Sequence, residues 1–133
     1  MKRSAPPRKR RPGAPRRGPL RSPSFRRWLV ENFKCAVCDS PYVQAAHTVN
    51  NGQSSKGPDS TCVTLCCRGD NHHAEYDAGR AAFEQKYHTS LPQVAALQWK
   101  CWVMMWATPR EIKLLHENWD DPVVNARYAK ENA

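Results

Sequence analysis

Side chains that can ligate a metal gather in two short segments of this 133-residue chain, at residues 35–38 and 66–73. The first segment reads CAVC and the second reads CCRGDNHH. The candidate ligands are Cys35, Cys38, His72 and either Cys66 or Cys67. Four such ligands form a closed tetrahedral zinc site, which is structural because no coordination position is left for a substrate. A site of this kind would fix the two segments against each other and so constrain the fold strongly.

The six cysteines could instead form disulfides in a secreted protein. They are unevenly spread and interleaved with histidines, however, and no apolar stretch of a secretory signal follows the basic N-terminus. The longest apolar run, residues 101–107, is far too short to cross a bilayer. These features favour metal ligation and predict a soluble protein of the cytoplasm without a membrane partner.

The positive charge is concentrated at the N-terminus. Residues 1–27 hold eleven Lys or Arg, six prolines and no acidic residue, whereas residues 28–133 hold ten basic and twelve acidic residues. We expect residues 1–23 to form a disordered basic arm that binds nucleic-acid phosphates. The arm residues expected to make these contacts are Arg8, Lys9, Arg10, Arg11, Arg16 and Arg17. The alternatives are a solubilising tail and a localisation signal.

Hydrophobic periodicity predicts an α+β domain over residues 24–133, with a helical C-terminal part at 90–133. The expected elements are a helix at 25–33 capped by Ser24, strands at 42–49 and 62–65 joined by a loop at 50–60, and a helix from Asp70 or Asn71 to about Tyr87. A helix at 91–106 is apolar nearly all round, which indicates a core helix or an oligomer contact. Thr108 and Glu111 have the spacing of a capping box that starts a further helix.

Three further residues suggest a second site. His73 and Asp77 are four positions apart on the expected helix, so they share a face and could hold a second cation with open coordination positions. His47 ends the first strand, where its imidazole could stand over that face and take a proton from water beside a metal-bound phosphate.

Several motifs in this order resemble the ββα-metal fold of HNH endonucleases, in particular small phage-type members in the style of the Rap and Ref recombination nucleases. They are AAH at 45–47, the G-x4-G-P-D loop at 52–59, VTLC at 63–66 and HHAEYD at 72–77, and the likeness covers about residues 33–88. The resemblance implies His47 as general base, His73 and Asp77 as ligands of the catalytic ion, and Cys35, Cys38, Cys66 and His72 as zinc ligands. Asp59 and Thr61 lie nearest to the middle Asn of the family name.

The implied activity is metal-dependent endonucleolytic hydrolysis of DNA in recombination or DNA processing, in a bacterial host cytoplasm. The implied cofactors are a structural Zn²⁺ and a catalytic divalent cation, Mg²⁺, Mn²⁺ or Zn²⁺. Lys56 and Arg80 are further candidates for phosphate contacts. Whether a recombinase filament takes part, and the oligomeric state, stay open.

The sequence also suggests two other functions. A zinc-containing module that binds nucleic acid without chemistry accounts for the cysteines and the basic arm, but it assigns no role to His47, His73 and Asp77. HAE at 73–75 also begins a zinc-deaminase signature, which needs a downstream P-C-x-x-C that this sequence lacks. Cys62 and Cys101 fall on apolar faces and are expected to be core residues.

Overall fold

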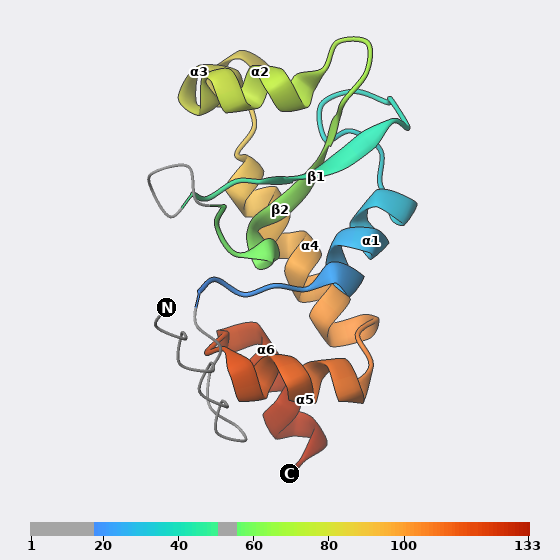
Figure 1. The fold of residues 1–133 in the computed structure, drawn as a ribbon, viewed down its shortest axis with the longest axis vertical. Coiled ribbons are helices and arrows are strands. Elements are labelled where there is room, and N and C mark those ends of the chain that lie inside the picture. Colours follow the sequence, from blue (N-terminus) through green and yellow to red (C-terminus); the bar gives the residue numbers. More distant parts are fainter. Residues whose placement is uncertain (1–17, 51–55) are drawn as a thin grey trace, which may run out of the picture.

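The computed structural model describes residues 18–50 and 56–133, which form six α-helices and one two-stranded sheet (Figure 1). The elements are α1 (Pro23–Asn32), β1 (Val43–His47), the short 3-10 helix η1 (Asp59–Thr61), β2 (Cys62–Cys66), α2 (His72–Ala78), α3 (Arg80–Tyr87), α4 (Leu91–Met105), α5 (Pro109–Asn118) and α6 (Pro122–Glu131). The predicted α+β class is confirmed. The predicted phosphate contacts Arg8, Lys9, Arg10, Arg11, Arg16 and Arg17 lie outside the described residues, as does the middle of the expected loop at 50–60.

The sheet is a pair of antiparallel strands in which Val43 lies opposite Cys66 and His47 lies opposite Cys62. This register places Cys66 at the end of the sheet that leads into α2, and His47 at the end beside η1. The candidate zinc ligands and the candidate general base therefore occupy opposite ends of one hairpin.

Helix α4 joins the two parts of the hydrophobic core. Figure 1 shows α4 passing behind the sheet toward α5 and α6. Its first half places Leu91 and Ala95 in the cluster of the sheet and α2, and its second half places Trp99 and Trp102 in the cluster of α1, α5 and α6. Because both clusters share this helix, the sheet is held firmly against the helical C-terminal part.

Helix α1 begins earlier than the sequence indicates. The hydroxyl of Ser22, and not of Ser24, accepts the N–H of Phe25 at 3.3 Å, and Pro23 is the first helical residue. Proline suits that position because its φ is already helical and no N–H is needed there. Leu20 is only 5% exposed and its carbonyl accepts the N–H of Asp59, so the packed chain starts before the expected boundary at residue 24.

The single helix expected up to Tyr87 is wrong, because the chain breaks at Gly79 into α2 and α3. Asn71 caps α2 as expected, with its side chain accepting the N–H of Ala74 at 3.3 Å. Glycine is a poor helix former, and the extended backbone of Gly79 ends α2. The rings of Tyr76 and Phe83 then pack edge to face across the break.

The apolar C-terminal helix is buried on one side only. Trp99 and Trp102 are buried as expected, but Trp106 is 63% exposed because α4 ends at Met105. Cys62 is a core residue as expected, whereas Cys101 is partly exposed. The predicted capping box is present, since Thr108 and Glu111 each accept the other's backbone N–H. Among the described residues, no helix has the length and apolar character needed to cross a membrane.

Candidate functional site

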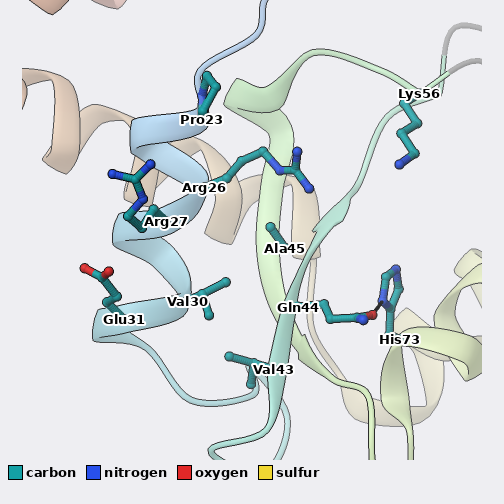
Figure 2. A pocket seen from close by; sticks show the side chains of 10 residues that line it. All are labelled: Pro23, Arg26, Arg27, Val30, Glu31, Val43, Gln44, Ala45, Lys56 and His73. Carbon is teal, nitrogen blue, oxygen red and sulfur yellow. Dashed lines mark hydrogen bonds between the residues drawn. The ribbon is translucent and has the colours of Figure 1, made fainter.

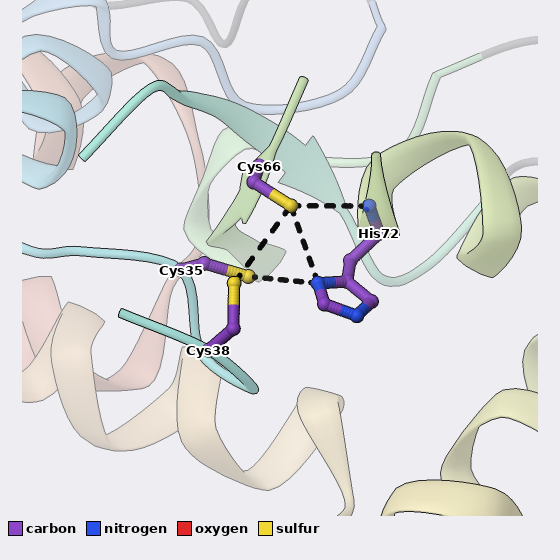
Figure 3. A group of neighbouring side chains, drawn as sticks. All are labelled: Cys35, Cys38, Cys66 and His72. Atoms are coloured by element: carbon purple, nitrogen blue, oxygen red, sulfur yellow. Dashed lines mark hydrogen bonds between the residues drawn. The ribbon is translucent and has the colours of Figure 1, made fainter. Parts of the chain in front are cut away.

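The four expected zinc ligands meet at one end of the sheet (Figure 3). Cys35 and Cys38 lie in the turn that follows α1, Cys66 is the last residue of β2, and His72 is the first residue of α2. Their ligand atoms all lie within 4.8 Å of one another, and all but Cys38 are buried. Two chain segments that are distant in sequence are thus brought together by the hairpin.

The spacing of these atoms fits a tetrahedral zinc. Ideal Zn–S and Zn–N bonds in that geometry put two sulfurs about 3.8 Å apart and a sulfur and a nitrogen about 3.6 Å apart. The Sγ atoms of Cys38 and Cys66 are 3.9 Å apart, and Nδ1 of His72 lies 3.6 Å from Sγ of Cys35 and 3.2 Å from Sγ of Cys66. The cluster could therefore bind a structural zinc ion.

Hydrogen bonds around the cluster hold the ligands in place. The backbone N–H of His72 donates to Sγ of Cys66 at 3.2 Å. The N–H of Cys35 donates to the carbonyl of Ser40 and closes the turn. The ring of His72 packs edge to face on Tyr87 at 5.2 Å. The ligands are thus preorganised by their own backbone and by α3.

The two thiols of the turn differ in acidity. Burial raises the pKa of Cys35, but N–H groups of Val37, Cys66 and Cys38 outweigh it and bring that pKa down to about 7. The N–H of Ser40 lowers the pKa of Cys38, yet burial and the neighbouring Cys35 raise it to about 11. Ionisation of one of these adjacent thiols therefore disfavours ionisation of the other. A bound cation would offset the repulsion between the two thiolates.

Cys67, the other candidate for the third position, points elsewhere. Its Sγ lies 3.4 Å from the carbonyl oxygen of Tyr42, and its N–H donates to the same carbonyl at 2.9 Å. Cys67 is the first residue after β2, and its Sγ is not among the ligand atoms that gather with Cys35, Cys38 and His72. The structure therefore selects Cys66.

A second group of predicted residues surrounds a cavity of about 210 Å³ between β1 and α2. The lining residues are Ala45, His47, Asn50, Lys56, His73, Asp77 and Arg80. The structure thus brings the expected base, both expected ligands of the catalytic ion and both expected phosphate contacts of the domain to one cavity.

His47 is held by a buried carboxylate. Its Nε2 lies 2.9 Å from Oδ1 of Asp59, and the two side chains are 9% and 2% exposed. Asp59 also accepts the N–H of Ser22 at 2.8 Å and a guanidinium hydrogen of Arg21 at 3.3 Å. Burial raises the pKa of Asp59, but hydrogen bonds from His47 and Ser22 and the nearby charge of Arg26 lower it overall. An ionised Asp59 accepts Nε2–H and leaves Nδ1 of His47 as the basic nitrogen.

His73 and Asp77 face each other across one helical turn, with Nε2 of His73 3.4 Å from Oδ2 of Asp77. Neighbouring ligands of an octahedral Mg²⁺-sized ion are about 3 Å apart, so this pair is close to the required spacing. Nδ1 of His73 lies 2.9 Å from Oε1 of Gln44, and donation of Nδ1–H to this oxygen leaves Nε2 to face Asp77. Among the described residues, no third Cys, His, Asp or Glu joins this pair.

The two expected phosphate contacts differ in availability. Arg80 already donates to the carbonyl of His47 at 2.9 Å and to Oδ1 of Asn50 at 3.1 Å, so it fixes the end of β1. Lys56 is exposed at the rim of the cavity. Of the two, Lys56 is the freer cation.

His47, Asp59 and Cys62 also lie within 4.8 Å of one another. Burial and the charge of Asp59 raise the pKa of Cys62 to about 12, which keeps the thiol neutral. Both oxygens of Asp59 already accept hydrogen bonds, one of them from the cationic Arg21. This group fits a hydrogen-bonded pair beside a core cysteine better than a metal site.

Three positioning residues were not assigned these roles from the sequence. In the sequence, Asp59 stands out only by its place near the family's Asn, and Gln44 and Asn50 carry no local signal. Their partners are His47 in β1, His73 in α2 and Arg80 in α3, which the tertiary fold brings to them, so no local spacing reveals them. The hydroxyl of Thr61, the other residue near that Asn, donates to the carbonyl of Pro58.

Comparison of the chain with protein-family models, with curated proteins and with solved structures returned no match. What the site can do therefore follows from its own residues and geometry.

Proposed function

We propose that the protein is a metal-dependent endonuclease of the HNH type that hydrolyses phosphodiester bonds of DNA. The observation that carries this proposal is that His47 and the His73–Asp77 pair line the same cavity. His47 is also paired with the buried carboxylate of Asp59. A general base beside a two-residue cation site with open positions can support metal-dependent phosphodiester hydrolysis.

In this mechanism Nδ1 of His47 takes a proton from the water that attacks phosphorus, while Nε2–H stays hydrogen-bonded to Asp59. The carboxylate of Asp59 stabilises the imidazolium that results. A divalent cation bound by His73 and Asp77 would neutralise the phosphate oxygens and the charge that develops on the leaving oxygen. Lys56 at the rim adds a positive charge for the phosphate.

The zinc cluster has a supporting role in this proposal. It joins the turn after α1 to the first residue of α2, and the next residue of α2 is His73. A structural zinc would therefore fix the start of the helix that carries both ligands of the catalytic ion.

The test is cleavage of supercoiled plasmid by the full-length protein with Mg²⁺ or Mn²⁺. We expect wild type to cut and His47→Ala to lose on the order of 10²- to 10⁴-fold in rate while it still binds plasmid. His88→Asn, an exposed histidine at the end of α3, is the matched control and should cut normally. If the wild-type protein binds plasmid but cuts it with neither ion, the protein would instead be a non-catalytic nucleic-acid-binding module stabilised by zinc.

A further inference from the structure

A larger groove lies next to the cavity of the proposed active site. It runs between α1 and β1, has a volume of about 610 Å³, and shares Ala45, Lys56 and His73 with the smaller cavity (Figure 2). The other lining residues are Pro23, Arg26, Arg27, Val30, Glu31, Val43 and Gln44. One end of the groove therefore opens at His73, beside the proposed site of hydrolysis.

Cations predominate in this groove. Arg26 and Arg27 on α1 and Lys56 across from them are all exposed, and none of the three forms an ion pair with another described residue. Figure 2 shows the Arg26 side chain extending from α1 toward β1, and Glu31, the one acidic lining residue, on the side away from His73. Three exposed cations that form no direct ion pair with a described residue make the groove complementary to a polyanion.

The floor between these cations is apolar. Pro23, Val30, Val43 and Ala45 contribute it, and Val30 remains 41% exposed. Sugars and base edges contact apolar side chains while phosphates contact cations at the rim, so this surface suits a polynucleotide better than a simple inorganic anion.

We propose that the α1–β1 groove binds the phosphodiester backbone of the DNA strand that flanks the bond to be cut, with Arg26, Arg27 and Lys56 as the phosphate contacts. This inference rests on the proposed nuclease function. A strand lying in the groove would present its next phosphate at the His73 end, between the proposed base and the proposed cation ligands.

The test is equilibrium binding of short fluorescent single-stranded and duplex DNA by the full-length protein, measured by anisotropy over a range of salt without added divalent cation. The groove variant carries Arg26→Gln, Arg27→Gln and Lys56→Gln. The control variant carries Arg110→Gln, Lys113→Gln and Lys130→Gln, which removes three exposed charges from α5 and α6. Both variants keep the basic N-terminal segment, so its contribution cancels. Equal zinc content and thermal midpoints establish that both are folded.

We expect the groove variant to bind DNA at least about tenfold more weakly than the control variant. The slope of log affinity against log salt concentration should also be shallower, by the equivalent of about 2 to 3 released counterions. Equal affinities for the two variants, in a protein whose wild type cuts plasmid, would overturn the groove inference and leave the nuclease standing. Weaker binding by the groove variant, in a protein whose wild type never cuts DNA, would support the groove as a DNA-binding site and overturn the nuclease proposal. A labelled mononucleotide bound as tightly as the oligonucleotides would show a small-ligand pocket and overturn the inference of a strand.

Discussion

Nε2 of His47 lies 2.9 Å from Oδ1 of Asp59, and the same carboxylate accepts the N–H of Ser22 at the start of α1. One buried side chain thus ties the end of β1, the residues before β2 and the N-terminus of α1 together. The carboxylate of Asp59 thus orients the proposed base and also stabilises the fold, so its removal should affect both stability and catalysis.

Asp59→Asn should destabilise the fold by about 1–3 kcal/mol at neutral pH, because charge-assisted hydrogen bonds to Ser22, Arg21 and His47 are weakened. The measurement is the free energy of unfolding in denaturant. Asp70→Asn, an exposed carboxylate before α2, is the control and should change this free energy little.

The difference between wild type and Asp59→Asn should also depend on pH. The pKa of Asp59 is lowered in the fold, so its ionised form is stabilised relative to the unfolded chain. That contribution is present above the unfolded-state pKa of about 4 and is lost as pH falls through the lower folded pKa. Thermal melts from about pH 5 to about pH 3 should show the two proteins converging. A gap that stays constant or widens toward acid would contradict this role of the carboxylate.

Cys66→Ser should abolish or greatly weaken zinc binding, whereas Cys67→Ser should bind zinc like wild type. The measurement is zinc content per chain by mass spectrometry after purification, together with the thermal midpoint before and after chelation. We expect one zinc in wild type and a midpoint that falls on chelation. If Cys67→Ser lost the zinc and Cys66→Ser kept it, the ligand set would be wrong.

Two glycines should respond oppositely to alanine. A Cβ at Gly57 would overlap the backbone carbonyl of Val49, whereas a Cβ at Gly79 would make only ordinary contact with Ala82. Gly57→Ala should therefore cost about 1–3 kcal/mol, and Gly79→Ala should be neutral or stabilise by about 0.4–1 kcal/mol. Denaturant unfolding of both variants provides the measurement, and equal effects would show that the close approach at Gly57 does not matter.

Gln44→Ala should lower the affinity of the proposed catalytic site for its cation, although Gln44 is not itself a metal ligand. The amide oxygen of Gln44 accepts Nδ1–H of His73 and so turns Nε2 toward Asp77. Loss of such a supporting contact costs about 10- to 100-fold in metal affinity or activity. The concentration of Mn²⁺ needed for half-maximal cleavage should rise for Gln44→Ala and stay unchanged for Gln93→Ala on α4. An unchanged requirement in Gln44→Ala would remove this residue from the site.

The sequence predicts those features that depend on local spacing. The C-x-x-C turn, His72 and the cap of α2 follow from short patterns, as does the capping box of Thr108. The choice of Cys66 over Cys67 depends on where the two sulfurs lie in the fold, Cys66 in the cluster and Cys67 against the carbonyl of Tyr42, and the run VTLCC does not show this.

Other features depend on tertiary packing. Ser22 replaces Ser24 as cap because Pro23 fits the first helical position and Asp59 holds the backbone there. Asp59, Gln44 and Asn50 meet their partners only when the hairpin comes together with α2 and α3. Trp106 lies on the apolar stripe of α4 but beyond the helix end, so periodicity assigns it to a core that it does not enter.

The most direct measurement of the proposed role of His47 is chemical rescue of plasmid cleavage by imidazole. If His47 is the general base, cleavage by His47→Ala should rise with added imidazole and with the fraction that is unprotonated, because the free base occupies the vacated position. Asp77→Asn, which impairs the proposed cation site, should not respond. Cleavage by His47→Ala at the wild-type rate, or a defect that imidazole never relieves in a correctly folded protein, would contradict the role assigned to His47.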